Sequence, residues 1–178
     1  NVDHGKLIKQ MWTMGIRDKV LLTIISKILK AKVEGIGVQQ KGTPQGGIIS
    51  PILSNIVLNE LDWWINSQWE GIKTIYPYGV QSTKTNALKK TKLKEMYIVR
   101  YADDFKIFCR NSKTAQKTFV AVKQWLKERL NLDISPEKSK VVNLRKNYSN
   151  FLGFKLKAKL KKKKHIAITH MCDKAMMK

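Results

Sequence analysis

Two adjacent carboxylates, Asp103 and Asp104, are the side chains in this sequence with the clearest potential for chemistry. They stand between two short runs rich in β-branched and aromatic residues, 96–101 and 105–109, so the sequence predicts a β-hairpin with both carboxylates at its tip. Like charges this close repel, and a hard divalent cation relieves the repulsion. We therefore interpret both residues as ligands of Mg²⁺, whose chemistry suits phosphoryl transfer. The alternative is an ordinary turn, in which Asp is common.

The charge of the chain points to a polyanionic partner. Its 178 residues include 35 Lys and Arg against 13 Asp and Glu, a formal net charge of +22, which a folded domain tolerates best beside a polyanion such as nucleic acid. An anionic membrane surface is the competing explanation, but that role usually needs a long basic amphipathic helix or a lipid anchor, and neither is evident. The longest apolar stretch, 20–28, is far shorter than the roughly 20 residues of a membrane span. We expect nucleic acid, and no membrane, as the partner.

The composition favours one compact domain in a reducing compartment. A hydrophobic content of 43% in a chain of this length is enough for a single core. The two cysteines, Cys109 and Cys172, form no disulfide framework, and no signal peptide opens the chain. We expect a cytoplasmic protein of a bacterium or of an organelle.

Apolar residues recur at helical spacing in several segments. The pattern predicts two amphipathic helices within residues 7–29, broken near Gly15. A third helix is expected to begin at Ser50 as N-cap, with a proline at its first helical position, and to end at about Gln68. A fourth is expected over 115–130. The third and fourth of these helices would pack on one face of the sheet that contains the carboxylate hairpin.

The remaining segments predict strands and loops. Five glycines in 34–47 favour turns and a close approach of the backbone to another molecule. Strands are expected near 141–144 and around 151–156. Little periodicity and many lysines indicate an exposed basic insertion at 71–95, and a basic strand pair at 155–178 leads out of the domain.

The motifs in their order resemble those of a known family. Tyr101-Ala102-Asp103-Asp104 resembles the Tyr-x-Asp-Asp hairpin of reverse transcriptases, in the form found in group II intron proteins. The block 41–62 is similar to the family's Gly-x-Pro-Gln-Gly segment, and 137–140 and 151–154 match two later blocks. The resemblance covers almost the whole chain. It implies the palm region of a reverse transcriptase of the group II intron (retron-type) kind.

The resemblance implies roles for individual residues. Asp103 would bind the catalytic metals and Asp104 would assist, with RNA template, DNA primer and dNTP as substrates and group II intron RNA as a further partner. A lysine, Lys138 or equally Lys140, would lie near the pyrophosphate leaving group, where an ammonium neutralises charge or donates a proton. The expected template and nucleotide pocket would include Pro44, Gln45 and Gly46, the primer end would lie near Tyr101 and Ala102, and the primer grip would contain Phe151, Leu152 and Gly153.

The same resemblance implies a fold and a missing residue. We expect an α+β fold, an RRM-like antiparallel palm sheet with helices packed on one face, over 1–178 as a single partial reverse transcriptase domain. The fingers would precede the chain, and the thumb and maturase regions would follow it. The family's first catalytic Asp would precede Asn1, since Asp3 matches a helix cap, so we expect this chain alone to be inactive. Two alternatives stay open: a non-enzymatic, maturase-like RNA-binding module, and a retron or diversity-generating reverse transcriptase.

Overall fold

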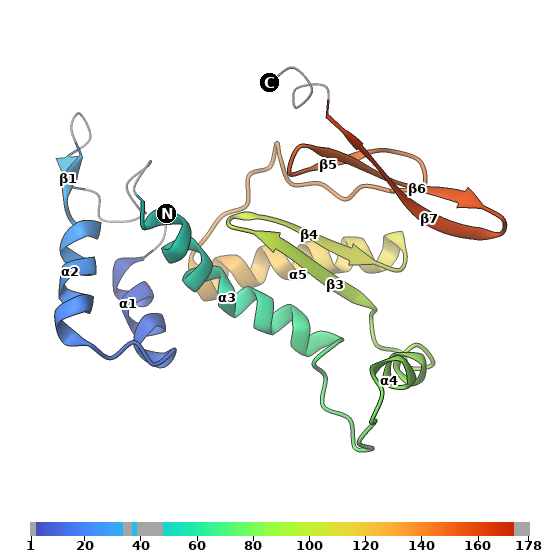
Figure 1. The fold of residues 1–178 in the computed structure, drawn as a ribbon, viewed down its shortest axis with the longest axis horizontal. Coiled ribbons are helices and arrows are strands. Elements are labelled where there is room, and N and C mark those ends of the chain that lie inside the picture. Colours follow the sequence, from blue (N-terminus) through green and yellow to red (C-terminus); the bar gives the residue numbers. More distant parts are fainter. Residues whose placement is uncertain (1–2, 34–36, 39–47, 173–178) are drawn as a thin grey trace.

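The computed structural model describes residues 3–33, 37–38 and 48–172, which form helices and short antiparallel strands (Figure 1). The helices are α1 (His4–Thr13), α2 (Lys19–Leu29), α3 (Ser50–Gln68), α4 (Gln81–Leu88) and α5 (Ser112–Leu130). The strands are β1 (Lys32–Val33), β2 (Gly37–Val38), β3 (Met96–Tyr101), β4 (Asp104–Cys109), β5 (Ser149–Phe151), β6 (Phe154–Lys161) and β7 (Lys164–Met171). The mixture agrees with the predicted α+β class.

The described strands form three separate antiparallel sheets and not one continuous sheet. β1 pairs with β2, β3 with β4, and β5, β6 and β7 follow one another. The described residues therefore contain the expected antiparallel pairing at the Asp103 hairpin, but they do not join the strands into one RRM-like sheet. The backbone hydrogen bonds of β3 and β4 run between these two strands. The third sheet contacts β4 through a side-chain hydrogen bond from Lys106 to Ser149.

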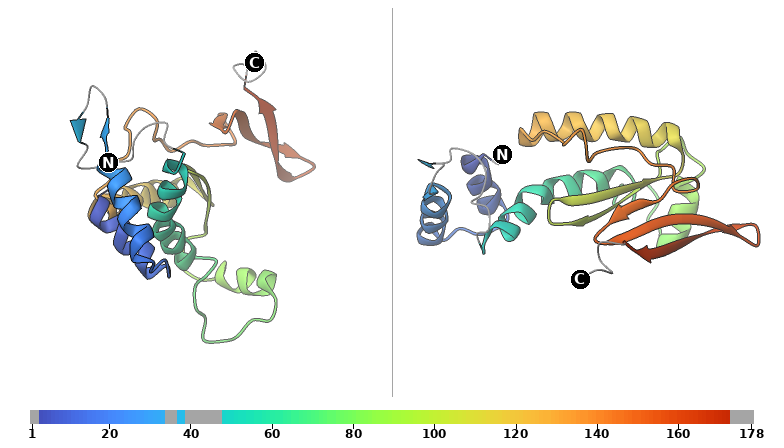
Figure 2. Two further views of the ribbon diagram at one scale, coloured as in Figure 1. Left: turned by 60° about the vertical axis from the view of Figure 1, so that its left-hand side comes forward. Right: turned by 90° about the horizontal axis from the view of Figure 1, so that it is seen from above.

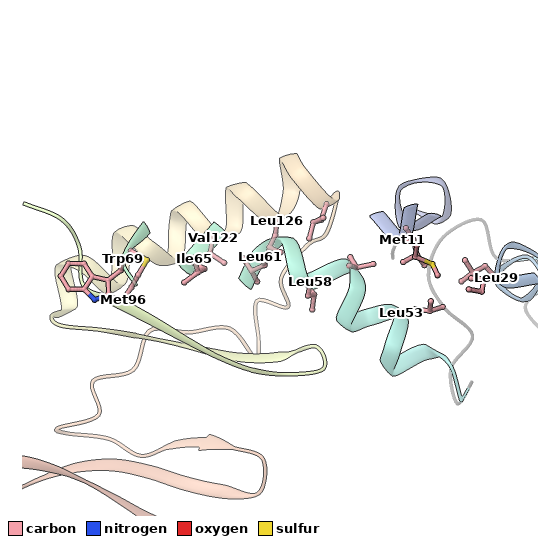
Figure 3. Close-up of a cluster of buried hydrophobic side chains, with 14 of the residues drawn as sticks. Met11, Leu29, Leu53, Leu58, Leu61, Ile65, Trp69, Met96, Val122 and Leu126 are labelled. Carbon is pink, nitrogen blue, oxygen red and sulfur yellow. The ribbon is translucent and has the colours of Figure 1, made fainter. Parts of the chain in front are cut away.

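The two long helices cover one face of the β3–β4 hairpin, as predicted (Figure 2). α3 packs on β3 and α5 packs on β4, and the helices meet through a stacked pair of indoles, Trp64 and Trp125, 5.2 Å apart. Figure 3 shows the core as a row of apolar side chains that runs from α2 and α1 along α3 to α5 and β3. Burial of each such side chain stabilises the fold by about 1.5–3 kcal/mol. The hairpin with the carboxylates therefore rests on a rigid base.

The predicted helices are present, with different beginnings. Gly15, at a φ of +98°, separates α1 from α2, a conformation that glycine adopts without strain. α3 has Ile49 as N-cap, without a side-chain cap, so the assignment of Ser50 as N-cap is wrong and Ser50 is already helical. α5 begins at Ser112 and not at 115 because the side chain of Asn111 accepts a hydrogen bond from the amide of Thr114 at 2.8 Å.

The strand expected at 141–144 does not form. The carbonyl of Asn143 accepts hydrogen bonds from the amides of Lys146 and Asn147, and its side chain accepts one from the amide of Arg145. Such local bonds offer the backbone an alternative to a sheet ladder. The segment is a loop that ends in a turn, although the amide of Ala158 still donates to the Leu144 carbonyl at 2.9 Å.

The segment 71–95 is mostly exposed and contains a helix that the sequence pattern did not predict. α4 lacks an apolar stripe, and Leu88 at its end is the side chain that it buries. Around 151–156 the chain forms the β5–β6 hairpin where a single strand was expected, because Leu152 and Gly153 make a tight turn. No helix in the described part of the chain is long and apolar enough to cross a membrane.

Candidate active site

The two carboxylates lie at the turn of the β3–β4 hairpin. The ladder runs from Met96 opposite Cys109 to Tyr101 opposite Asp104, which leaves Ala102 and Asp103 as a two-residue turn. Asp103 is thus at the tip, and β4 begins at Asp104, one position earlier than the predicted start at Phe105. Both side chains are exposed. A neighbouring cation can therefore reach either carboxylate without the cost of opening the core.

Ala102 holds an uncommon backbone conformation in this turn. Its φ is +52°, in the left-handed region that costs a residue with a Cβ atom about 1–2 kcal/mol. Such strain persists where the surrounding structure fixes it, and it is frequent at active sites. Neighbouring side chains must therefore hold Ala102 in this conformation.

Arg100 connects this turn to helix α3. Its guanidinium donates to both carboxylate oxygens of Asp62, from Nε at 2.9 and 3.0 Å and from Nη2 at 2.5 Å. Its Nη1 donates to Oδ1 of Asn55 at 2.8 Å and to the carbonyl of Ala102 at 2.7 Å. We call Arg100, Asp62, Asn55 and the Ala102 carbonyl the arginine clamp. It fixes the strained turn to helix α3.

The sequence reasoning gave no role to the clamp residues. A signal was present, since Asn55 and Asp62 are seven residues apart on one helix and so share a face. Arg100 stands within the motif that contains the carboxylates. The pairing of the two segments needs the tertiary structure.

A cavity of about 960 Å³ opens beside the carboxylates. Asp103 and Asp104 line it at the hairpin, and Lys138 and Lys140 line it from the loop after α5. Its further walls come from β4, α5, β5 and β6 and include the predicted primer-grip residues Phe151, Leu152 and Gly153. Segments that are about 50 residues apart thus meet around one space. Because both lysines line it, the choice between Lys138 and Lys140 stays open.

Lys106 joins the hairpin to the third sheet across this cavity. Its Nζ donates to Oγ of Ser149 at 2.7 Å and lies 5.9 Å from the centre of the Phe151 ring. Burial lowers the pKa of this ammonium, the Asp104 carboxylate opposes that shift, and the nearby Lys140 ammonium adds to it. Lys106 therefore sets the position of β5 relative to the carboxylates.

The turn of the predicted primer grip is strained as well. Leu152 has a φ of +51° and Gly153 one of +80°, and Phe151 and Phe154 pair on either side. Two positive φ angles are typical of a type I′ turn, which favours Asn and Gly and not a branched apolar residue. Leu152 is 46% exposed, so packing in the core does not explain its presence.

The remaining predicted site residues fall into two groups. Tyr101, 66% exposed at the end of β3, and Ala102 do not line the cavity, although Ala102 directly precedes Asp103, which does. Pro44, Gln45 and Gly46 lie outside the described residues.

The donors at the turn fit Mg²⁺ in part. Carboxylate oxygens are the ligands that this ion prefers, and it usually binds through one or two of them together with water and phosphate oxygens. The described residues contain no group of three or more His, Cys, Asp or Glu that could hold a metal. Asp62 is not a free donor, because Arg100 occupies both of its oxygens. Asp103 and Asp104 are therefore the candidate ligands in this part of the chain.

A family model described as reverse transcriptase (RNA-dependent DNA polymerase) matches residues 1–156. The chain is also 28% identical over 168 residues to the protein YkfC of Escherichia coli, a match that covers 86% of this chain and 43% of YkfC. It is 28% identical over 200 residues to the group II intron-encoded protein LtrA of Lactococcus lactis, covering 89% of this chain and 33% of LtrA. An uncharacterized 91 kDa protein in the cob intron of Schizosaccharomyces pombe is 28% identical over 195 residues, covering 86% of this chain and 23% of that protein. The chain thus spans less than half the length of these relatives.

Proposed function

The chain belongs to the reverse transcriptase (RNA-dependent DNA polymerase) family, and we propose that it is the palm part of an RNA-directed DNA polymerase of the group II intron kind. The observation that carries the proposal is the common cavity of Asp103, Asp104, Lys138 and the segment 151–153. An RRM-like arrangement of the complete palm is part of the proposal. So is a role in the maturation or mobility of an intron RNA.

The proposed reaction joins an incoming dNTP to the end of a DNA primer on an RNA template. Asp103 and Asp104 would hold Mg²⁺, which supplies charge stabilisation to the attacking and leaving oxygens. Lys138 or Lys140 would place an ammonium near the leaving pyrophosphate, where it neutralises developing charge. Leu152, exposed in its strained turn, would contact the primer beside Phe151. Pro44, Gln45, Gly46, Tyr101 and Ala102 would contact template, nucleotide and primer end.

We further propose that the chain of 178 residues does not extend a primer by itself. Two carboxylates are fewer than a two-metal site usually uses. The described residues offer no third carboxylate beside the pair.

Primer extension on an RNA template tests the function. The chain is extended at its amino terminus toward the length of the relatives, and Asp103→Asn is compared with Asp133→Asn, a surface carboxylate paired with Lys127. We expect Mg²⁺-dependent extension that falls at least about 100-fold in the first variant, as removal of an electrostatic group at a reacting centre does, and stays unchanged in the second. Tight RNA binding without any extension would instead favour the maturase-like module. Extension by the chain of 178 residues alone would refute the proposal on its inactivity.

A further inference from the structure

The third sheet has two chemically different faces. Along β6, alternate side chains point to opposite sides. Leu156 and Ala158, with His165 on β7, line the cavity beside the carboxylates. Lys155, Lys157, Lys159 and Lys161 occupy the alternate positions, and none of them lines that cavity. We call these four residues the lysine face. It is directed away from the candidate active site.

Positive charge concentrates around this face to an unusual degree. Residues 138–172 contain eleven Lys and Arg and no Asp or Glu, half of the chain's net charge of +22. Lys138, Lys140 and Arg145 among them line the cavity, and seven lysines lie in the β6–β7 hairpin, 154–171. In the β6–β7 turn, Lys162 and Lys163 both have positive φ, and Lys161 pairs with Lys164 across the hairpin. A segment without carboxylates cannot neutralise its own positive charge. The electrostatic cost of holding these charges together is relieved when a polyanion binds.

Aromatic groups lie among the lysines. The Nζ of Lys157 is 4.9 Å from the centre of the Tyr148 ring, and the ring of His170 meets Tyr148 edge-on at 6.1 Å. His170 pairs with Lys155 in the ladder, so it shares the lysine face. Tyr148 is 45% exposed and His170 is exposed. Lysines that follow a backbone, interleaved with exposed rings, are typical of surfaces that bind single-stranded nucleic acid.

We propose that the lysine face binds an unpaired RNA strand at a second site, separate from the template and primer in the cavity. The choice of RNA rests on the proposed function, in which RNA is the polymer that the protein holds during synthesis. The four lysines repeat every second residue, so their Cα atoms follow one another at about 6.6–6.8 Å in a straight row. Lys159 and Lys161 are exposed and Lys155 and Lys157 are half-buried, so the row offers its ammonium groups in sequence to the phosphates of an extended strand. Tyr148 and His170 offer rings to its bases.

The affinity of this chain for a 20-nucleotide unpaired RNA, measured at several salt concentrations, tests the proposal. In the variant with all four lysines changed to Gln, affinity at low salt falls about tenfold or more. The slope of log K against log salt becomes shallower by about 0.7 for each phosphate that is no longer neutralised by a lysine, and so by up to about 3. A variant with the same four lysines changed to Arg keeps the charge and should bind as the unaltered chain does. Thermal unfolding of both variants checks that the hairpin still folds.

The matched control removes four exposed lysines elsewhere, Lys90, Lys92, Lys94 and Lys113. Both quadruple variants have the same net charge, so an equal loss of affinity in the two would overturn the proposal. A DNA strand of the same sequence that binds more tightly than the RNA would overturn the assignment to RNA. This binding assay needs neither Mg²⁺ nor a primer and a dNTP, so it does not depend on the candidate catalytic carboxylates. Failure of the lysine-face variants to alter RNA binding is therefore distinct from failure of the polymerase assay.

Discussion

The arginine clamp predicts a large loss of stability when Arg100 is changed to Gln. The side chain of Arg100 is 11% exposed and that of Asp62 is 32% exposed, and the guanidinium makes hydrogen bonds to three groups. A hydrogen bond to a charged group contributes about 1.5–3 kcal/mol, and removal of one partner from a buried ion pair costs about 3–5 kcal/mol. Because Asp62 is about one-third exposed, water compensates part of this cost. We expect the free energy of unfolding to fall by roughly 2–3 kcal/mol.

The control is a second Arg–carboxylate pair in the same chain. Arg129 donates from Nε to Glu60 at 2.8 Å, but its side chain is 63% exposed, so Arg129→Gln should cost less than about 1 kcal/mol. Urea denaturation measures both variants. Arg100→Lys should recover less than half of the loss, because one ammonium cannot reproduce the planar fork that reaches Asp62, Asn55 and the Ala102 carbonyl together.

A double-mutant cycle isolates the clamp itself. The coupling energy between Arg100→Gln and Asp62→Asn should be about 1–3 kcal/mol, since the two side chains are in direct contact. Hydrogen exchange at residues 101–104 should rise in Arg100→Gln, because the Ala102 carbonyl loses its donor. A coupling energy below about 0.5 kcal/mol, or equal losses in Arg100→Gln and Arg129→Gln, would refute the reasoning.

Three other side chains give further predictions. Burial raises the pKa of Glu60, but hydrogen bonds from Gln10 and Arg129 outweigh burial, so the pKa of this carboxyl is lowered overall. The Glu60 carboxylate therefore stabilises the fold above its ordinary pKa of 4.5, and this contribution is lost as pH falls through the folded-state pKa. Urea midpoints measured against pH should show this dependence, and Glu60→Gln should remove it. Lys106→Met should increase hydrogen exchange at 149–151, because the Ser149 hydrogen bond is lost. The free energy of unfolding should change by less than about 1 kcal/mol, because relief of the buried charge offsets that loss. Unchanged exchange would mean that Lys106 does not hold β5. Leu152→Asn should stabilise the fold by about 1 kcal/mol and so raise the melting temperature, because Asn adopts the left-handed conformation more easily than Leu. The same variant should lower primer extension. An unchanged or lower melting temperature would show that the turn is not strained.

The local elements and the chemistry could be predicted from the sequence because both depend on short-range patterns. Apolar spacing and the break at Gly15 predicted α1, α2, α3 and α5, and the two strand-like runs predicted the hairpin with Asp103. The order of motifs predicted the reverse transcriptase family, which the family match confirms. The roles of the individual site residues stay predictions.

The errors occurred where local bonds compete with patterns. The hydrogen bonds at Asn143 replaced a strand by a turn, and the cap at Asn111 lengthened α5. α4 has no apolar stripe that could have predicted it.

By itself, the sequence determined the helices, the hairpin, the excess of positive charge and the family, since each follows from neighbouring residues or from their order. The tertiary structure alone decided that Arg100 reaches Asp62, that Lys106 reaches Ser149 and that the lysine face points away from the cavity. Those hydrogen bonds join residues 38 and 43 positions apart, and which face of a sheet meets a cavity depends on how the sheets pack. No local pattern contains that information, because the packing of the helices and sheets sets it.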